Sequence, residues 1–100
     1  MFLISVAIAL ASCTDPCPPR DPEKIHPMIP YEFPNEFDDH ACWSAYKITV
    51  ATGKSDYWSC INSISPTSPN VCALRAQCEA IYDAYMDGAE LGYFKCVNGL

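Results

Sequence analysis

The apolar residues of this chain gather in one uninterrupted run at its start and in two periodic segments of its second half. Residues 2–10 are apolar except for one serine. Such a run is too short to cross a hydrocarbon core of about 30 Å, which takes about 20 helical residues, but it suits the apolar region of a signal peptide. The sequence therefore predicts export, with residues 1–12 as the signal peptide.

The two periodic segments repeat one pattern of residues. Residues 42–64 and 78–100 align at a constant offset of 36 positions, and both follow C-x3-Y-x10-Y-[WF]-x-C-[IV]-N-x-[IL]. Self-similarity of this kind indicates two copies of one supersecondary unit. We therefore expect repeat units over about 35–64 and 70–100. The identical pairs are Cys42/Cys78, Tyr46/Tyr82, Tyr57/Tyr93, Cys60/Cys96 and Asn62/Asn98.

Each repeat unit is predicted to fold as helix, turn, helix. In the second unit Asn70 can cap the first helix, and Gly88 lies where a residue of positive φ would end it. Asn35 and Gly53 take the same places in the first unit, where the β-branched run 48–50 would also suit a short strand. The apolar stripe of the first helix in the second unit consists of Leu74, Cys78, Ile81 and Tyr85.

The predicted fold class is all-α. Second helices are expected to begin near Ser55 and near Glu90, and the Ser- and Pro-rich segment 65–69 is the linker between the units. Residues 35–100 are thus expected to form a small disulfide-stabilised domain with four short helices, arranged as two helical hairpins.

Length and charge exclude several classes of protein. A chain of 100 residues is too small for a Rossmann or barrel enzyme, and a core of fewer than about 70–80 ordered residues seldom supplies more than about 3–5 kcal/mol of stability. The net charge is −6 at pH 7 and the Lys and Arg residues are not clustered. Nucleic acid is therefore not an expected partner, and neither is an anionic lipid surface bound through charge.

Seven cysteines suggest how the small core is reinforced. Seventeen residues separate Cys42 from Cys60, and seventeen separate Cys78 from Cys96, so a disulfide could close each predicted hairpin. Cys17 and Cys72 would then pair by elimination. Six cysteines allow 15 connectivities, so this pairing is a hypothesis that rests on the symmetry of the repeat.

The seventh cysteine, Cys13, ends a motif at the leader. Leu10-Ala11-Ser12-Cys13 resembles the lipobox of bacterial lipoproteins. The resemblance covers residues 1–13 and implies that Cys13 carries a lipid and becomes the first residue after cleavage. In the alternative, ordinary signal peptidase cuts after the A-x-A site Ala9-Leu10-Ala11, and Cys13 is left as the odd cysteine of a secreted protein.

Residues 13–34 hold seven of the nine prolines. This spacing excludes regular helix over the segment and favours extended, polyproline-like backbone. Two interpretations remain open: a semi-rigid tether between lipid and domain, or an arm packed on the domain. The apolar residues available to such an arm are Ile25, Met28, Ile29, Tyr31 and Phe33.

No motif for catalysis, metal or cofactor binding is present. A catalytic pair of His40 and Cys42 would need a thiolate, whereas the repeat and export predict a disulfide sulfur. Glu36, Asp39 and His40 could ligate a metal, but carboxylates in a first helical turn are explained by the helix dipole. A calcium loop beginning at Asp83 has Phe94 where a bidentate Glu is required.

The remaining candidate for recognition is an aromatic side chain. Trp43 has Glu79 as its counterpart in the second copy, so it is expected on the surface as a binding contact. The sequence thus predicts an exported, lipid-anchored, non-enzymatic binding or envelope-surface module with an unknown protein or small-molecule partner. The alternative is a freely secreted signalling, toxin or defence-like protein. Aromatic positions shared by both copies are core candidates: Tyr46, Tyr57, Trp58, Tyr82, Tyr93 and Phe94.

Overall fold

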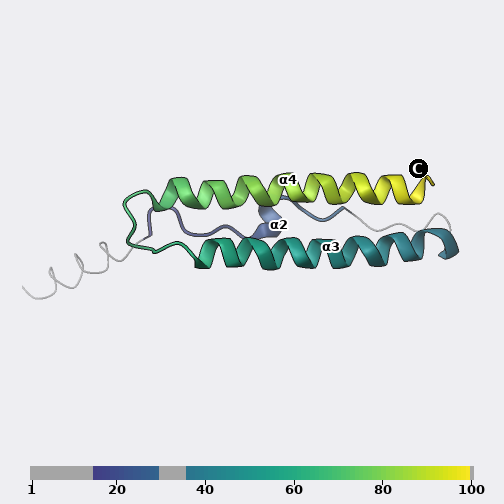
Figure 1. Cartoon of the computed structure of the whole chain (residues 1–100), viewed down its shortest axis with the longest axis horizontal. Helices are drawn as coiled ribbons and strands as arrows, with labels where there is room; N and C mark the ends of the chain where they lie inside the picture. The colour runs from purple at the N-terminus through teal and green to yellow at the C-terminus, as the bar shows by residue number, and fades with distance from the viewer. Residues whose placement is uncertain (1–14, 30–35, 100) are drawn as a thin grey trace, which may run out of the picture.

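A computed structural model describes residues 15–29 and 36–99 of the chain, with side chains from residue 40 onward in the second range. It contains the short helix α2 (Pro22–Ile25) and the long helices α3 (Glu36–Asn62) and α4 (Val71–Val97). Helices α3 and α4 lie antiparallel along their whole length, and residues 15–29 run beside them (Figure 1). The described residues form no strand, so the all-α class is confirmed, but one long hairpin replaces the two short ones that we predicted.

The two glycines that were predicted to end helices lie inside them. Gly53 lies within α3 and Gly88 within α4, and each helix continues to 27 residues. A glycine weakens a helix by only about 1 kcal/mol relative to alanine, which packing along a buried face overcomes. The stop signal is instead at Gly99, where φ is +70° and the backbone N–H donates to the Cys96 carbonyl.

The repeat therefore encodes two helices rather than two hairpins. Because the helices are antiparallel, the first shared tyrosine of one copy meets the second shared tyrosine of the other. Tyr46 lies against Tyr93 with ring centroids 5.3 Å apart, and Tyr57 lies against Tyr82 at 5.4 Å. The duplicated pattern thus gives the hairpin an approximate two-fold symmetry.

Three disulfides follow this arrangement: Cys17–Cys72, Cys42–Cys96 and Cys60–Cys78. The predicted pairs Cys42–Cys60 and Cys78–Cys96 are wrong, because 18 positions along a continuous helix span about 27 Å, whereas a disulfide needs Cα atoms about 4.4–6.8 Å apart. Two of the bridges join α3 to α4. The third joins Cys17 of the proline-rich segment to the first turn of α4, as predicted by elimination.

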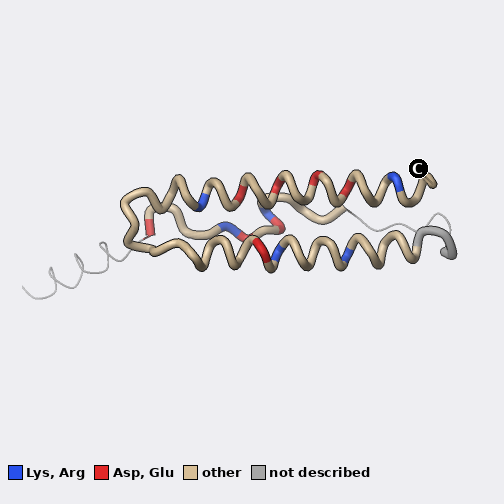
Figure 2. Tube along the Cα trace, viewed as in Figure 1, with Lys and Arg blue, Asp and Glu red and all other residues tan. Residues whose placement is uncertain are grey.

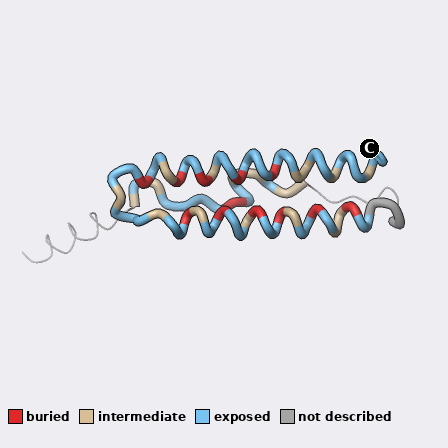
Figure 3. The backbone as a smooth tube through the Cα atoms, viewed as in Figure 1, coloured by how far each residue is buried: buried red, intermediate tan, exposed pale blue. Residues whose placement is uncertain are grey.

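The core lies along the α3–α4 contact on the side where residues 15–29 pack. On α4 the buried stripe is rotated from the predicted one, because Ile81 is 66% exposed and Tyr85 is 37% exposed. Figure 3 shows the buried positions of the two helices facing each other. The core residues are Tyr46, Val50, Tyr57, Ile61, Cys78, Tyr82 and Met86.

The proline-rich segment 15–29, called the arm from here on, packs on the hairpin. Its apolar residues Ile25, Met28 and Ile29 lie against the core. The Tyr57 hydroxyl donates to the Arg20 carbonyl at 2.8 Å, and the Asp21 side chain caps α2. The prediction of no helix in this segment is thus wrong for one turn, because Pro22 occupies the first helical position, where no backbone N–H is needed. The structure thus shows a packed arm rather than a tether over these residues. Tyr31 and Phe33 lie outside the described residues.

A buried arginine fixes the start of the arm. The side chain of Arg75 is 7% exposed and donates to the Asp15 carboxylate at 2.5 Å and to the Cys17 carbonyl at 2.7 Å. The hydrogen bonds from Arg75 and from the backbone N–H of Cys17 hold the pKa of Asp15 below its usual value. An ion pair therefore reinforces the end of the arm that the Cys17–Cys72 bridge also holds.

Gly53 is required where α3 and α4 approach each other. A Cβ at this position would lie 2.6 and 2.7 Å from two ring carbons of Tyr85, so any side chain must displace that ring. We expect Gly53→Ala to destabilise the protein by about 1 kcal/mol, because overpacking outweighs the gain in helix propensity. The change is measured by urea unfolding followed by circular dichroism.

The matched control is Gly88→Ala, where an added Cβ meets no atom within 4 Å. This variant should gain up to about 1 kcal/mol from helix propensity alone. Equal stabilisation by both substitutions would show that Tyr85 does not pack on Gly53.

Candidate functional site

The hairpin has one covered face and one open face. On α4 the arm contacts Glu79, Asp83 and Glu90, whereas Tyr85 and Gly92 lie on a different side of the helix. We call that second side, with the facing residues of α3, the open face. It is lined by Cys42, Ala45, Thr49, Gly53, Asp56 and Cys60 of α3 and by Cys78, Ile81, Ala84, Tyr85, Gly88, Gly92 and Cys96 of α4.

Two hollows lie along the open face, and Tyr85 lines both. The larger has a volume of about 430 Å³ and extends to the Cys42–Cys96 disulfide. The smaller, of about 70 Å³, extends to the Cys60–Cys78 disulfide. Because both disulfides bridge the helices at this surface, they fix the separation of the walls.

The larger hollow is suited to binding. None of the described residues that line it is charged, and alanine and glycine make up much of the lining. Besides the cysteines, its polar residues are Thr49 and three tyrosines, and burial raises the pKa of one of these, Tyr46. Its two cysteines form a disulfide, so the described residues that line this hollow offer neither a thiolate nor a histidine or carboxylate for proton transfer.

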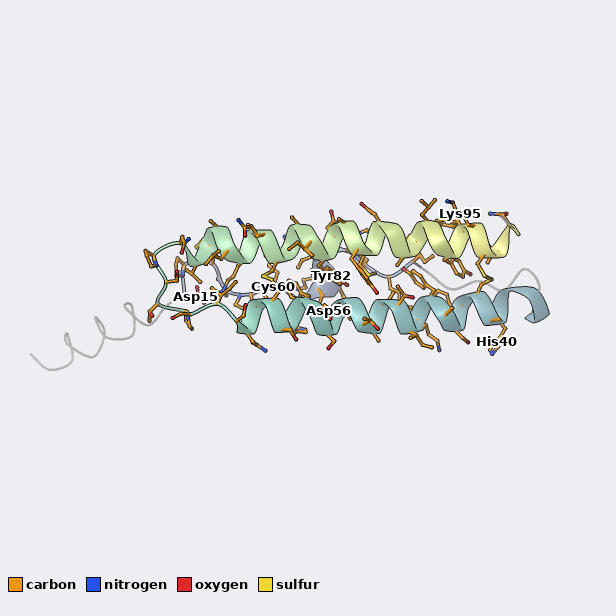
Figure 4. The ribbon with its side chains drawn as sticks, in the orientation of Figure 1. Asp15, His40, Asp56, Cys60, Tyr82 and Lys95 are labelled. Carbon is orange, nitrogen blue, oxygen red and sulfur yellow. A yellow bond between two sulfur atoms is a disulfide. The ribbon has the colours of Figure 1, made fainter. Side chains whose placement is uncertain are left out.

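Beside the smaller hollow, Tyr82 lies between the helices (Figure 4). Burial raises the pKa of its hydroxyl to about 12. That hydroxyl makes no hydrogen bond to a described residue. It is therefore a neutral buried group rather than an acid or base.

A second site lies where the arm meets α4. The His26 side chain is 12% exposed, and its Nδ1 is 2.6 Å from Asp83 Oδ1 and 3.8 Å from Asp87 Oδ1. Its Nε2 is 3.2 Å from Glu90 Oε2. Burial alone would lower the pKa of His26, but the hydrogen bonds to Asp83 and Glu90 outweigh it and raise that pKa.

Charge around this cluster is unbalanced. Figure 2 shows the acidic residues in a row along the middle of α4. Three of the described cations pair with other carboxylates: Arg20 with Glu79, Lys54 with Glu23 and Arg75 with Asp15. Within the described ranges, no Lys or Arg forms an ion pair with any of the three carboxylates that surround His26.

The exposure of the aromatic residues differs from the prediction at three positions, Trp43, Trp58 and Phe94. Trp43 is partly buried and packs on Tyr46 and Tyr93, with ring centroids 5.4 and 5.8 Å apart. Two aromatic residues expected in the core are exposed instead, Trp58 by 39% and Phe94 by 50%. Trp43 therefore packs beside the core rather than standing free on the surface.

The structure does not describe a site formed by the candidate metal ligands Glu36, Asp39 and His40. His40 is exposed on α3 and points away from the hairpin (Figure 4), and the side chains of Glu36 and Asp39 lie outside the described residues. The acidic segment that faintly matched a calcium loop is continuous helix. Cys13 and the signal peptide also lie outside the described residues.

Comparison with other proteins adds no assignment. No protein family, no characterised protein and no solved structure matches this chain significantly. Neither long helix has an apolar stretch sufficient to span a bilayer over the part of the chain that the structure describes.

Proposed function

We propose that this protein is an exported, non-enzymatic binding module anchored to a membrane by a lipid on Cys13. The observation that carries the proposal is the cysteine count. Three disulfides use six of the seven cysteines, so none of the cysteines that the structure describes is left to pair with Cys13. Disulfides of this number are typical of exported proteins.

An anchor at Cys13 would orient the hairpin. The ion pair of Asp15 with Arg75 and the bridge of Cys17 to Cys72 hold the following residues against the first turns of α4. The loop end of the hairpin would therefore face the membrane. Helices of 27 residues place the Cys42–Cys96 end about 40 Å further out.

The larger hollow of the open face is the binding surface in this proposal, and its ligand is a small, apolar molecule. Its volume of about 430 Å³ lies within the 300–1,000 Å³ typical of small-molecule sites. The described residues of its lining carry no charge that could pair with an ionic ligand. The tyrosine rings of the lining provide apolar contact area for such a ligand.

The anchor is tested by expressing the chain with its leader in a bacterial host in the presence of a palmitate analogue. We expect the protein to incorporate the label and its mature N-terminus to be Cys13. The Cys13→Ala variant keeps the A-x-A site and should lose the label. An unlabelled protein that begins at Ser12 would contradict the anchor and support the freely secreted alternative.

The binding surface is tested with the apolar fluorophore N-phenyl-1-naphthylamine. We expect saturable fluorescence enhancement, and at least a tenfold loss of affinity in Gly92→Leu, whose new side chain would fill the hollow without meeting another atom within 4 Å at Cβ. The control, Ala80→Leu, adds the same side chain at an exposed position outside the hollow. Equal affinity in both variants would refute this site.

A further inference from the structure

The cluster around His26 has the composition of a transition-metal site. One ligand atom from each of His26, Asp87 and Glu90 lies within 4.8 Å of the others. The histidine comes from the arm and the carboxylates from α4, so the folded chain assembles the set from distant positions. Imidazole with carboxylates is a ligand combination that suits Zn²⁺.

We propose that His26, Asp87 and Glu90 bind Zn²⁺, with Asp83 orienting the histidine. His26 Nε2 and Glu90 Oε2 are 3.2 Å apart. Zinc bonds of about 2.0–2.2 Å place neighbouring ligands of a tetrahedral site about 3.3–3.5 Å apart. The observed pair thus needs almost no movement to share one ion.

Asp83 has a separate part in this arrangement. Its Oδ1 accepts a hydrogen bond from His26 Nδ1 at 2.6 Å, which directs the lone pair of the imidazole to Nε2. Histidines that ligate metals commonly donate their other ring N–H to a carboxylate in this way. The third ligand, Asp87, has a side chain that is 69% exposed, so solvent leaves it room to turn toward the ion.

The charge of the cluster also favours a dication. Three carboxylates face one histidine, and none of them pairs with a Lys or Arg of the described residues. A protonated His26 would leave an excess of two negative charges. Zn²⁺ bound to the neutral imidazole would balance more of that charge and would cross-link the arm to α4.

This inference is independent of the proposed function. It is tested by isothermal titration of the purified, disulfide-bonded protein with Zn²⁺ at pH 7.5 after treatment with EDTA. We expect one site, an at least tenfold weaker association in His26→Gln, and a 10–100-fold weaker one in Asp83→Asn. Mg²⁺ and Ca²⁺ should bind far more weakly, because they prefer all-oxygen ligand sets.

Two control variants exclude other sources of zinc binding. His40→Gln removes the other histidine of the chain, and Asp56→Asn removes an exposed carboxylate of α3 outside the cluster. Both should bind Zn²⁺ as the unchanged protein does. Circular dichroism of each variant establishes that it is folded. Absence of binding by the unchanged protein, or equal affinity in His26→Gln, would show that His26 is only a protonated bridge between carboxylates.

Discussion

Removal of the Cys17–Cys72 disulfide in a C17A/C72A variant is expected to lower the free energy of unfolding by about 4 kcal/mol. The bridge closes a loop with a sequence separation of 55, and a loop of that length confers about 4 kcal/mol in the chain-entropy treatment. Urea unfolding measured by circular dichroism, in a Cys13→Ser background, gives the difference. Part of the loss should appear as local release of the arm, since this bridge and Arg75 hold its start.

The comparison variant is C60A/C78A, whose bridge has a sequence separation of only 18. Its expected loss is about 3 kcal/mol. Limited trypsin digestion separates the two variants further, because only C17A/C72A should become readily cleaved at Arg20 and Lys24. Full protection of both sites in C17A/C72A would show that the disulfide does not hold the arm.

Tyr57→Ala is expected to destabilise the protein by about 3–5 kcal/mol. Tyr57 is 2% exposed and packs in the core that α3 and α4 share with the arm. Truncation of a buried aromatic residue leaves a cavity and removes most of its apolar contacts. The same substitution also deletes the hydrogen bond to the Arg20 carbonyl.

Two variants separate these contributions in the same unfolding measurement. Tyr57→Phe keeps the ring and removes only the hydroxyl, so a loss of about 1 kcal/mol is expected. Trp58→Ala alters the neighbouring residue, which is 39% exposed, and should cost less than Tyr57→Ala. A larger effect at Trp58 than at Tyr57 would place the core on the other side of α3.

The repeat was visible in the sequence, but its structural unit was not. The spacing of Cys42 from Cys60 fits a closed hairpin and a straight helix equally well. The hairpin is predicted because Gly53 is a common type of residue at a helix end. In the structure the helix continues through Gly53. A glycine is needed at this position because the ring of Tyr85 packs directly on it. A local signal for a helix stop was overridden by a contact with a residue far along the chain.

The position of the arm explains the other differences. The period of α4 predicts an apolar stripe through Ile81 and Tyr85, but the arm packs on another side and rotates the buried stripe toward Tyr82 and Met86. The same docking brings His26 to Asp83 and Glu90. Carboxylates one and two turns apart on α4 could be seen in the sequence. The contact of His26 with these carboxylates could not be predicted, because a proline-rich segment has no periodicity that fixes its position along a helix.

Disulfide mapping of the native protein tests most directly whether each repeat unit is a single helix of one cross-linked hairpin. Trypsin cleaves beyond Lys24, Lys47, Lys54, Arg75 and Lys95 and so separates Cys42, Cys78 and Cys96. The structure predicts a product in which residues 25–47 are joined to residues 96–100. A product that joins residues 76–95 to residues 96–100 would place the bridge within the second repeat unit and contradict the long hairpin.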